Sequence, residues 1–194
     1  PHLFSSAASD VYKRQDNDGW DFDRNGTVEQ WEKFTNYEEY LNGTDPNDND
    51  TDGDGMVDGW EGYYGLNPRS AEDRDWDSDG DGYDSNGDGE LSPDEKFTNF
   101  EEYLMNTNPV KADTDGDNCT DGWEIYWNDN KPADEDRTLD PLDGIDGFLD
   151  YDEDGWEDWE GVQYNFPNWR EERANTNPWD PDTDDDGMTD GFEA

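Results

Sequence analysis

The chain has 194 residues, of which 57 are acidic and 12 basic, and its formal net charge is −45. Only 28% of the residues are hydrophobic and no apolar run is long enough to cross a membrane, so we expect neither a large core nor a transmembrane segment. The negative charge also disfavours nucleic acid and anionic membranes as partners. The single Cys and the single His, Cys119 and His2, exclude an internal disulfide and a zinc cluster.

Bound cations would explain how so acidic a chain folds. Disordered chains rarely carry as many aromatic residues as the 10 Trp, 10 Tyr and 8 Phe of this sequence. Many of the acidic residues are Asp interleaved with Gly, and Asp favours loops over helices. Divalent cations would cancel part of the repulsion and order a loop around each ion. An acidic surface without bound ions would show no fixed spacing of its carboxylates.

Residues 1–15, PHLFSSAASDVYKRQ, differ from everything that follows, because they contain Lys13, Arg14 and the only His but no acidic repeat. We expect them to be an adaptor-derived or disordered segment outside the fold, with a remnant of a targeting segment as the alternative. The chain has no initiator Met, and its last Asp-rich loop stops at Ala194. We therefore expect a fragment of a longer protein.

The rest of the sequence consists of repeats. The stretch DNDGWDFDRNGTVEQWEKFTNYEEYLNGTDP from Asp16 matches DGDGYDSNGDGELSPDEKFTNFEEYLMNTNP from Asp79 without a gap. The match continues between DTDGDGMVDGWEGYY from Asp50 and DTDGDNCTDGWEIYW from Asp113, and a looser copy begins with DYDEDGW at Asp150. The predicted domains are calcium repeat 1 at 16–78, calcium repeat 2 at 79–141, and a diverged, truncated calcium repeat 3 at 142–194.

Capping motifs predict short helices along the chain. TNYEEYL carries a Thr-x-x-Glu cap at Thr35, and DGWEGYYG predicts about two helical turns ended by Gly65. SPDE places Ser92 at the N-cap of a further helix with Glu95 as its reciprocal cap, and TNFEEYL repeats the first cap at Thr98. Asn-Pro and Asp-Pro pairs then stop the helices at Pro46, Pro68, Pro109 and Pro178.

Five stretches fit the EF-hand type of calcium loop, in which positions 1, 3, 5, 7, 9 and 12 supply oxygen ligands. Position 7 binds through its backbone carbonyl, and Gly at position 6 allows the sharp turn. The predicted ligands are Asp21, Asp23, Asn25, Thr27, Glu29 and Glu32; Asp50, Asp52, Asp54, Met56, Asp58 and Glu61; Asp84, Asn86, Asp88, Glu90, Ser92 and Glu95; Asp113, Asp115, Asp117, Cys119, Asp121 and Glu124; and Asp182, Asp184, Asp186, Met188, Asp190 and Glu193. Asn118 replaces the position-6 Gly of the fourth loop and tolerates the positive φ required there. Ligation by oxygen alone favours Ca²⁺ over Mg²⁺.

A sixth loop starts at Asp77, but its position 12 would be Asp88, which the loop from Asp84 already uses. We predict that the stretch from Tyr83 to about Phe97 is an insertion, so that an outer loop, which resumes at Phe97, closes around an inner one. The predicted outer ligands are Asp16, Asp18, Phe34, Asn36 and Glu39; Asp77, Asp79, Asp81, Phe97, Asn99 and Glu102; and Asp150, Asp152, Asp154, Phe166, Asn168 and Glu171. Repeat 3 lacks the Asp-rich pattern of the inner loop but keeps the ligands of the outer loop. Two separate sites can be lost separately, whereas a single merged site could not. We expect about seven or eight Ca²⁺ ions in all.

These residues resemble the thrombospondin type 3 calcium repeats of bacterial and archaeal surface proteins. DTDGDGMVDGWEGYYGLNP and TNYEEYLNGTDP are similar to the two halves of that repeat, and the resemblance covers nearly the whole chain after Gln15. It implies mostly irregular calcium-stabilised loops with short α-helices, in an elongated EF-hand-like array without significant β-sheet, outside the cell. The disulfide-forming Cys residues of animal repeats are missing, and the nested insertion is not part of the basic pattern.

We expect a structural spacer, stalk or adhesion segment of a larger extracellular or cell-surface protein. Its partners would be calcium, other domains of that protein, and an extracellular protein or glycan. The alternative is a dockerin-like, carbohydrate- or protein-binding module of a secreted enzyme, with Trp20, Trp31, Trp156 or Trp159 as a platform, although we expect these rings to pack beside the loops. A calcium sensor would need longer helices that expose an apolar groove. No enzyme is expected, since the sequence shows no usable His or Cys–His pair, nucleophile elbow or phosphate loop.

Overall fold

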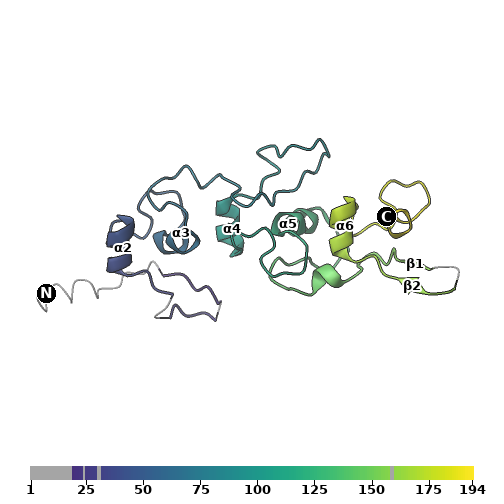
Figure 1. The fold of residues 1–194 in the computed structure, drawn as a ribbon, viewed down its shortest axis with the longest axis horizontal. Coiled ribbons are helices and arrows are strands. Elements are labelled where there is room, and N and C mark those ends of the chain that lie inside the picture. Colours follow the sequence, from purple (N-terminus) through teal and green to yellow (C-terminus); the bar gives the residue numbers. More distant parts are fainter. Residues whose placement is uncertain (1–18, 24, 30–31, 158–159) are drawn as a thin grey trace, which may run out of the picture. The chain divides into compact units, whose positions relative to one another are not determined.

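A computed structural model describes residues 19–23, 25–29, 32–157 and 160–194, which form short helices joined by long loops (Figure 1). The helices are α2 (Asn36–Asn42), α3 (Asp58–Tyr64), α4 (Asn99–Met105), α5 (Asp121–Asn130), the 3₁₀ helix η1 (Asp146–Phe148), α6 (Asn168–Ala174) and α7 (Asp190–Glu193). Strands β1 (Trp156–Glu157) and β2 (Gln163–Tyr164) pair antiparallel, with Trp156 opposite Tyr164. The prediction of mostly irregular structure with short helices is therefore confirmed.

The chain divides into two compact units. The first contains Pro1–Ser78 and Thr98–Val110, and the second contains Asp79–Phe97 and Lys111–Ala194. The chain thus leaves the first unit after Ser78 and returns to it at Thr98. The division into three repeats is based on sequence similarity and stays a prediction.

The Thr-x-x-Glu caps begin two of the helices as expected. Thr35 accepts from the N–H of Glu38 at the start of α2, and the Glu38 carboxylate accepts from the N–H of Thr35 at 2.7 Å. Thr98 forms the same capping box in α4. α2 and α3 end at Gly43 and Gly65, whose φ values of 78° and 80° lie in the left-handed region that glycine adopts without strain.

The prediction of a helix at SPDE is wrong. Ser92 donates to the Glu95 carboxylate from its backbone N–H at 3.0 Å and from its hydroxyl at 2.7 Å, but residues 93–95 form only a turn. The N-cap of α4 follows at Thr98, so the chain has no room for a second helical turn. The Glu95 carboxylate instead closes the loop by accepting from the N–H of Ser85 at 3.1 Å.

Aromatic side chains form the small core of the first unit. Trp60 is fully buried, and its ring centroid lies 5.0 Å from that of Tyr64 and 5.2 Å from that of Tyr103. The Trp20 ring lies 4.5 Å from that of Tyr103, tilted by 38°, and Trp20 donates from Nε1 to Asn106 Oδ1 at 2.7 Å. Trp20 is thus half-buried within this cluster, as packing beside the loops predicts. Trp31 and Trp159 lie outside the described residues, as does the side chain of Trp156.

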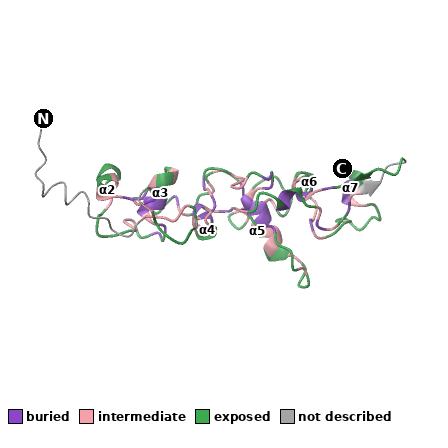
Figure 2. Ribbon diagram, turned by 90° about the horizontal axis from the view of Figure 1, so that it is seen from below, coloured by how far each residue is buried: buried purple, intermediate pink, exposed green. Residues whose placement is uncertain are grey.

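The core of the second unit is equally small. Cys119, Trp123, Leu139 and Tyr151 are buried together. Trp179 stacks on Tyr151 with 5.2 Å between ring centroids. Figure 2 shows that buried stretches are confined to parts of helices such as α3 and α5 and to adjoining loop residues. Within the described part of the chain, every helix is too short or too polar to cross a bilayer.

Candidate metal centres

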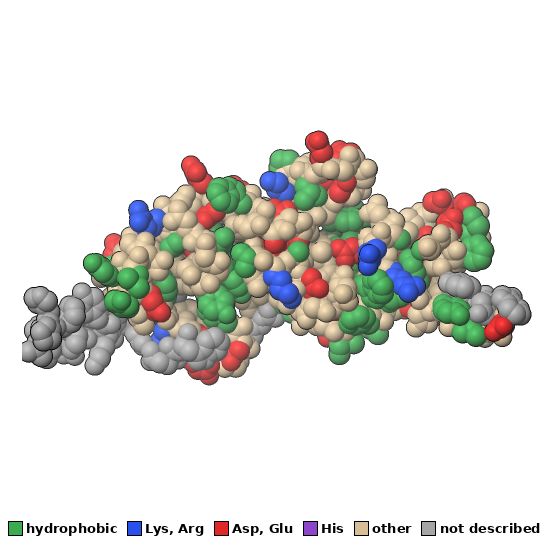
Figure 3. Space-filling view, viewed as in Figure 1, with side chains coloured by type: hydrophobic (Ala, Val, Ile, Leu, Met, Phe, Trp, Pro, Cys, Tyr) green, Lys and Arg blue, Asp and Glu red, His purple; other side chains and the backbone are tan. Residues whose placement is uncertain are grey.

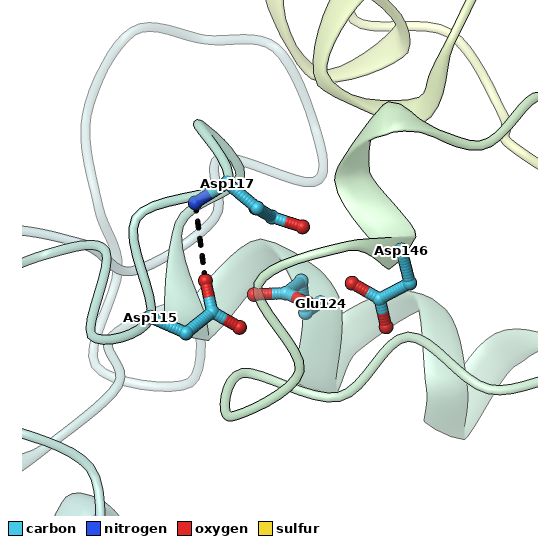
Figure 4. A group of neighbouring side chains, drawn as sticks. All are labelled: Asp115, Asp117, Glu124 and Asp146. Atoms are coloured by element: carbon cyan, nitrogen blue, oxygen red, sulfur yellow. Dashed lines mark hydrogen bonds between the residues drawn. The ribbon is translucent and has the colours of Figure 1, made fainter.

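Four carboxylates of the second unit meet beside α5 (Figure 4). Asp115 and Asp117 lie in the loop before the helix, Glu124 lies in its first turn, and Asp146 begins η1. Each residue offers one oxygen, and these oxygens all lie within 4.8 Å of one another. Asp117 and Glu124 are 0% exposed and Asp146 is 4% exposed. The arrangement supplies an oxygen-only ligand set of the kind that Ca²⁺ prefers.

Backbone N–H groups donate to Asp115, Asp117 and Asp146, but half of the carboxylate oxygens in this group have no hydrogen-bond donor among the described residues. Both oxygens of Glu124, Oδ1 of Asp146 and Oδ2 of Asp115 have no partner among the described residues. Burial, followed by repulsion from Asp117, raises the pKa of Glu124 to about 11. Burial is also the main reason why the pKa of Asp146 rises to about 7 and that of Asp115 to about 6. Buried carboxylates of this kind require either protons or a cation at neutral pH.

A similar centre lies beside α3 in the first unit. Asp54, Glu61 and Asp73 are buried, and each offers an oxygen within 4.8 Å of the others. Asp54 also belongs to a second group with Asp50 and Asp52. Both oxygens of Glu61 have no partner among the described residues, and burial raises the pKa of Glu61 to about 9.

The first aspartate of each loop organises the backbone around it. The carboxylate of Asp50 accepts from the N–H groups of Gly53 at 2.9 Å, Asp54 at 3.1 Å and Gly55 at 3.1 Å. Gly55 has a φ of 99°, which fits the requirement for Gly at position 6. Asn118, at the same position in the fourth loop, has a φ of 81°, so the prediction that Asn tolerates this conformation is confirmed.

The aspartates predicted at position 9 hold the loop itself. The Asp121 carboxylate accepts from the N–H of Thr114 at 2.8 Å and from its hydroxyl at 2.7 Å. Asp58 accepts the same pair of bonds from Thr51. Asp190 accepts them from Thr183, which makes this contact common to all three D-T-D loops. A direct bond between these aspartates and a metal ion stays a prediction.

Two of the residues predicted at position 7 are fully buried. Met56 and Cys119 are 0% exposed, and their N–H groups donate to Asp54 and Asp117.

Glu32 lies close to Asp21 and Asp23, and its carboxylate accepts from the N–H of Phe22, Asp23 and Glu29. Hydrogen bonds from Ser92 and Ser85 lower the pKa of Glu95 to about 2. The inner glutamates are therefore hydrogen-bonded, whereas Glu61 and Glu124 are not.

The outer ligands predicted for repeat 3 all lie in the second unit, although about a dozen residues separate their two segments. Asp154, Phe166, Asn168 and Glu171 are buried, and Asp152 is half-buried. Burial, with smaller repulsion from Asp152 and Asp154, raises the pKa of Glu171 to about 9, and burial raises that of Asp152 to about 7. Five oxygens have no partner among the described residues: Asp150 Oδ1, Asp152 Oδ2, Asp154 Oδ1, Asn168 Oδ1 and Glu171 Oε1.

The other two outer loops stay predictions. Asp16 and Asp18 of repeat 1 lie outside the described residues, whereas Phe34 and Glu39 are buried and Asn36 is half-buried. The outer ligands of repeat 2 are divided between the compact units: Asp77, Asn99 and Glu102 belong to the first, and Asp79, Asp81 and Phe97 to the second.

The loop at 182–193 forms the same backbone pattern on the surface. Asp182 accepts from the N–H groups of Asp186 at 3.1 Å and Gly187 at 2.9 Å. Met188 is 41% exposed, unlike Met56, and Glu193 is exposed.

Sequence reasoning missed Asp73 and Asp146. Each lies four positions before the first aspartate of an outer loop, at Asp77 and Asp150. Each backbone carbonyl also accepts from a predicted outer ligand, Asn99 Nδ2 for Asp73 at 2.7 Å and Asn168 Nδ2 for Asp146 at 2.8 Å. This shared spacing is a signal that could have identified both residues.

In comparisons with known proteins, no family model, curated protein or solved structure matches the chain. The resemblance to thrombospondin type 3 repeats therefore stays a prediction based on the quoted motifs.

Proposed function

We propose that the chain is a calcium-binding structural spacer or adhesion segment of a larger extracellular protein. The observation that carries this proposal is the group of buried carboxylates around Glu124, whose two oxygens have no hydrogen-bond donor among the described residues. Such a group is unfavourable as a set of unpaired anions, and a divalent cation removes that cost.

Calcium fits these groups better than other metals. Their ligands are carboxylate, amide and carbonyl oxygens, which hard cations prefer, and the loops are irregular enough for the variable geometry of Ca²⁺. Extracellular calcium modules bind with Kd values of about 10⁻⁴–10⁻³ M, so the sites would stay loaded outside the cell. With about seven or eight ions the formal charge would still be about −30, and the chain without ions would expand through self-repulsion.

Small-angle scattering with and without a chelator, together with ion counting by native mass spectrometry, tests this function. We expect a compact chain with several bound Ca²⁺ ions, and an expanded chain once the chelator removes them. A matched titration with Mg²⁺ serves as the control, because Mg²⁺ demands a tighter octahedral site. A chain that stays equally compact after complete removal of calcium would refute the proposal.

A further inference from the structure

Asn168 links two of the candidate metal centres of the second unit. Its side chain is fully buried, and Nδ2 donates to the backbone carbonyl of Asp146 at 2.8 Å. Asn168 Oδ1 has no hydrogen-bond donor among the described residues. Asn168 is a predicted ligand of the outer loop of repeat 3, whereas the Asp146 carboxylate belongs to the centre beside α5. One amide side chain therefore holds a residue of the α5 centre and has its oxygen available for the outer centre.

Asp146 depends on such contacts for its position. It begins η1, outside the loop and helix that supply the other three carboxylates of the α5 centre. The backbone N–H of Asn168 donates to the carbonyl of Leu149 at 2.8 Å, and the N–H of Gly147 donates to the Asp117 carboxylate. The residues of η1 are therefore hydrogen-bonded both to the α5 centre and to the first residue of α6.

The first unit repeats this arrangement. Asn99 is fully buried, its Nδ2 donates to the carbonyl of Asp73 at 2.7 Å, and its N–H donates to the carbonyl of Trp76 at 2.7 Å. Asn99 Oδ1 also has no donor within the described part of the chain, and the Asp73 carboxylate belongs to the centre beside α3. Two connections of different length thus end in the same contact, as expected if the contact serves the metal centres.

Without bound ions, both centres of the second unit contain buried carboxylates that repel each other. Glu171 is repelled by Asp152 in the outer centre, and Glu124 by Asp146 in the α5 centre. The acidic side chains that Figure 3 shows scattered over one face are screened by water and salt, but Glu124 and Glu171 are buried. Repulsion that opens the outer loop would also move Asn168, and with it the segment that carries Asp146.

We propose that Asn168 is a positioning residue that couples the two centres, so that calcium at the outer centre of repeat 3 raises the calcium affinity of the α5 centre. This inference rests on the proposed function, because it requires both centres to bind calcium. With an ion at Oδ1, the Asn168 amide is a stronger donor through Nδ2 and keeps Asp146 within reach of the α5 centre. Coupling between binding sites is reciprocal, so an ion at the α5 centre raises the affinity of the outer centre by the same factor.

Cys119 provides a readout of the α5 centre alone. It is the single Cys of the chain, it is fully buried, and it lies between Asp117 and Glu124. Its reaction with a thiol reagent across a calcium titration gives the calcium concentration at which half of the thiol is protected. We expect calcium to protect Cys119 in the unchanged chain, and we call this concentration the protection midpoint.

Glu171→Gln removes a predicted ligand of the outer centre and should raise the protection midpoint by about fivefold or more, although Glu171 is not part of the α5 group. Glu95→Gln is the matched control, because it changes a predicted ligand of an inner loop in the same unit; its midpoint should stay within about twofold. Asn168→Asp keeps a side-chain oxygen but loses the Nδ2 donor, so it should raise the midpoint about as much as Glu171→Gln. In the double variant Asn168→Asp/Glu171→Gln we expect a further rise of no more than about twofold.

Ion counting by native mass spectrometry separates failure of this coupling from failure of the proposed function. A chain that binds no calcium would refute both. A chain that binds calcium without protecting Cys119, or whose midpoint shifts equally in Glu171→Gln and Glu95→Gln, would overturn the coupling alone. Additive shifts in the double variant would also overturn it, because Glu171 would then act without Asn168. If circular dichroism in saturating calcium shows that Asn168→Asp does not fold, the comparison of Glu171→Gln with Glu95→Gln decides.

Discussion

Changing Asp146 to Asn removes one of the four carboxylates beside α5 and leaves the backbone contact in place. The Asp146 carbonyl still accepts from Asn168 Nδ2, and the amide oxygen of Asn can replace the carboxylate as acceptor for the N–H of Asp140, which now lies 2.7 Å away. The variant therefore isolates the charge that Asp146 brings to this centre. Asp143→Asn is the matched control, because Asp143 is exposed and lies three residues away in the same segment.

The expected effect has opposite signs with and without calcium. At a calcium concentration of about 100 Kd one ion stabilises the fold by about 2.7 kcal/mol, and a tenfold weaker site leaves about 1.4 kcal/mol. The calcium-loaded variant should therefore lose about 1.3 kcal/mol, or about 3–5 °C in melting temperature for a chain of this length. In a chelator the same variant should gain stability, because burial raises the pKa of Asp146 and makes its charged form unfavourable.

Thermal unfolding followed by circular dichroism, in calcium and in chelator, measures both signs. Calcium titration by calorimetry should show one site weakened about tenfold in Asp146→Asn and none in Asp143→Asn. Destabilisation by the same amount in both conditions would refute the reasoning, because Asp146 would then have only a structural role.

Three further predictions concern pH, loop geometry and the nested loops. Burial raises the pKa of Glu61 from its usual 4.5 to about 9, so without calcium the folded chain binds the Glu61 proton more tightly than the unfolded chain does. The stability that this proton contributes is fully present below pH 4.5 and is lost as the pH rises toward 9. Melting temperatures measured in chelator should therefore fall across this pH range. In calcium we expect the reverse, with loss of stability in acid as protons compete with the ion. Thr114→Val removes the hydroxyl donated to Asp121 and should cost about 1–2 kcal/mol by urea denaturation in calcium, and an unchanged midpoint would contradict this. Glu95→Gln and Glu102→Gln should each remove a different single ion in native mass spectra, whereas loss of the same ion would exclude separate inner and outer sites in repeat 2.

The most predictable features of this protein are those that depend on residues close together in the chain. The capping box at Thr98 formed as expected, because its partners lie three residues apart. The loop from Asp50 folds around the carboxylate of that residue, as the spacing of its aspartates and glycines predicts. The helix expected at Ser92 failed for a reason visible only in context, since Glu95 closes a loop and the cap of α4 follows too soon.

The sequence by itself determined the repeats, the short helices and the loops with their closely spaced carboxylates, because these follow from local spacing. Only the tertiary structure placed Asp73 against Glu61 and Asp146 against Glu124. The segment between Glu61 and Asp73 differs in length and composition from the segment between Glu124 and Asp146. A gap-free alignment of the two repeats therefore does not place Asp73 opposite Asp146. The tertiary structure also showed that Asp121 accepts hydrogen bonds from Thr114. Contacts between distant segments depend on how the chain folds back on itself, so the spacing before the outer loops marks Asp73 and Asp146 but does not reveal which glutamate each one meets.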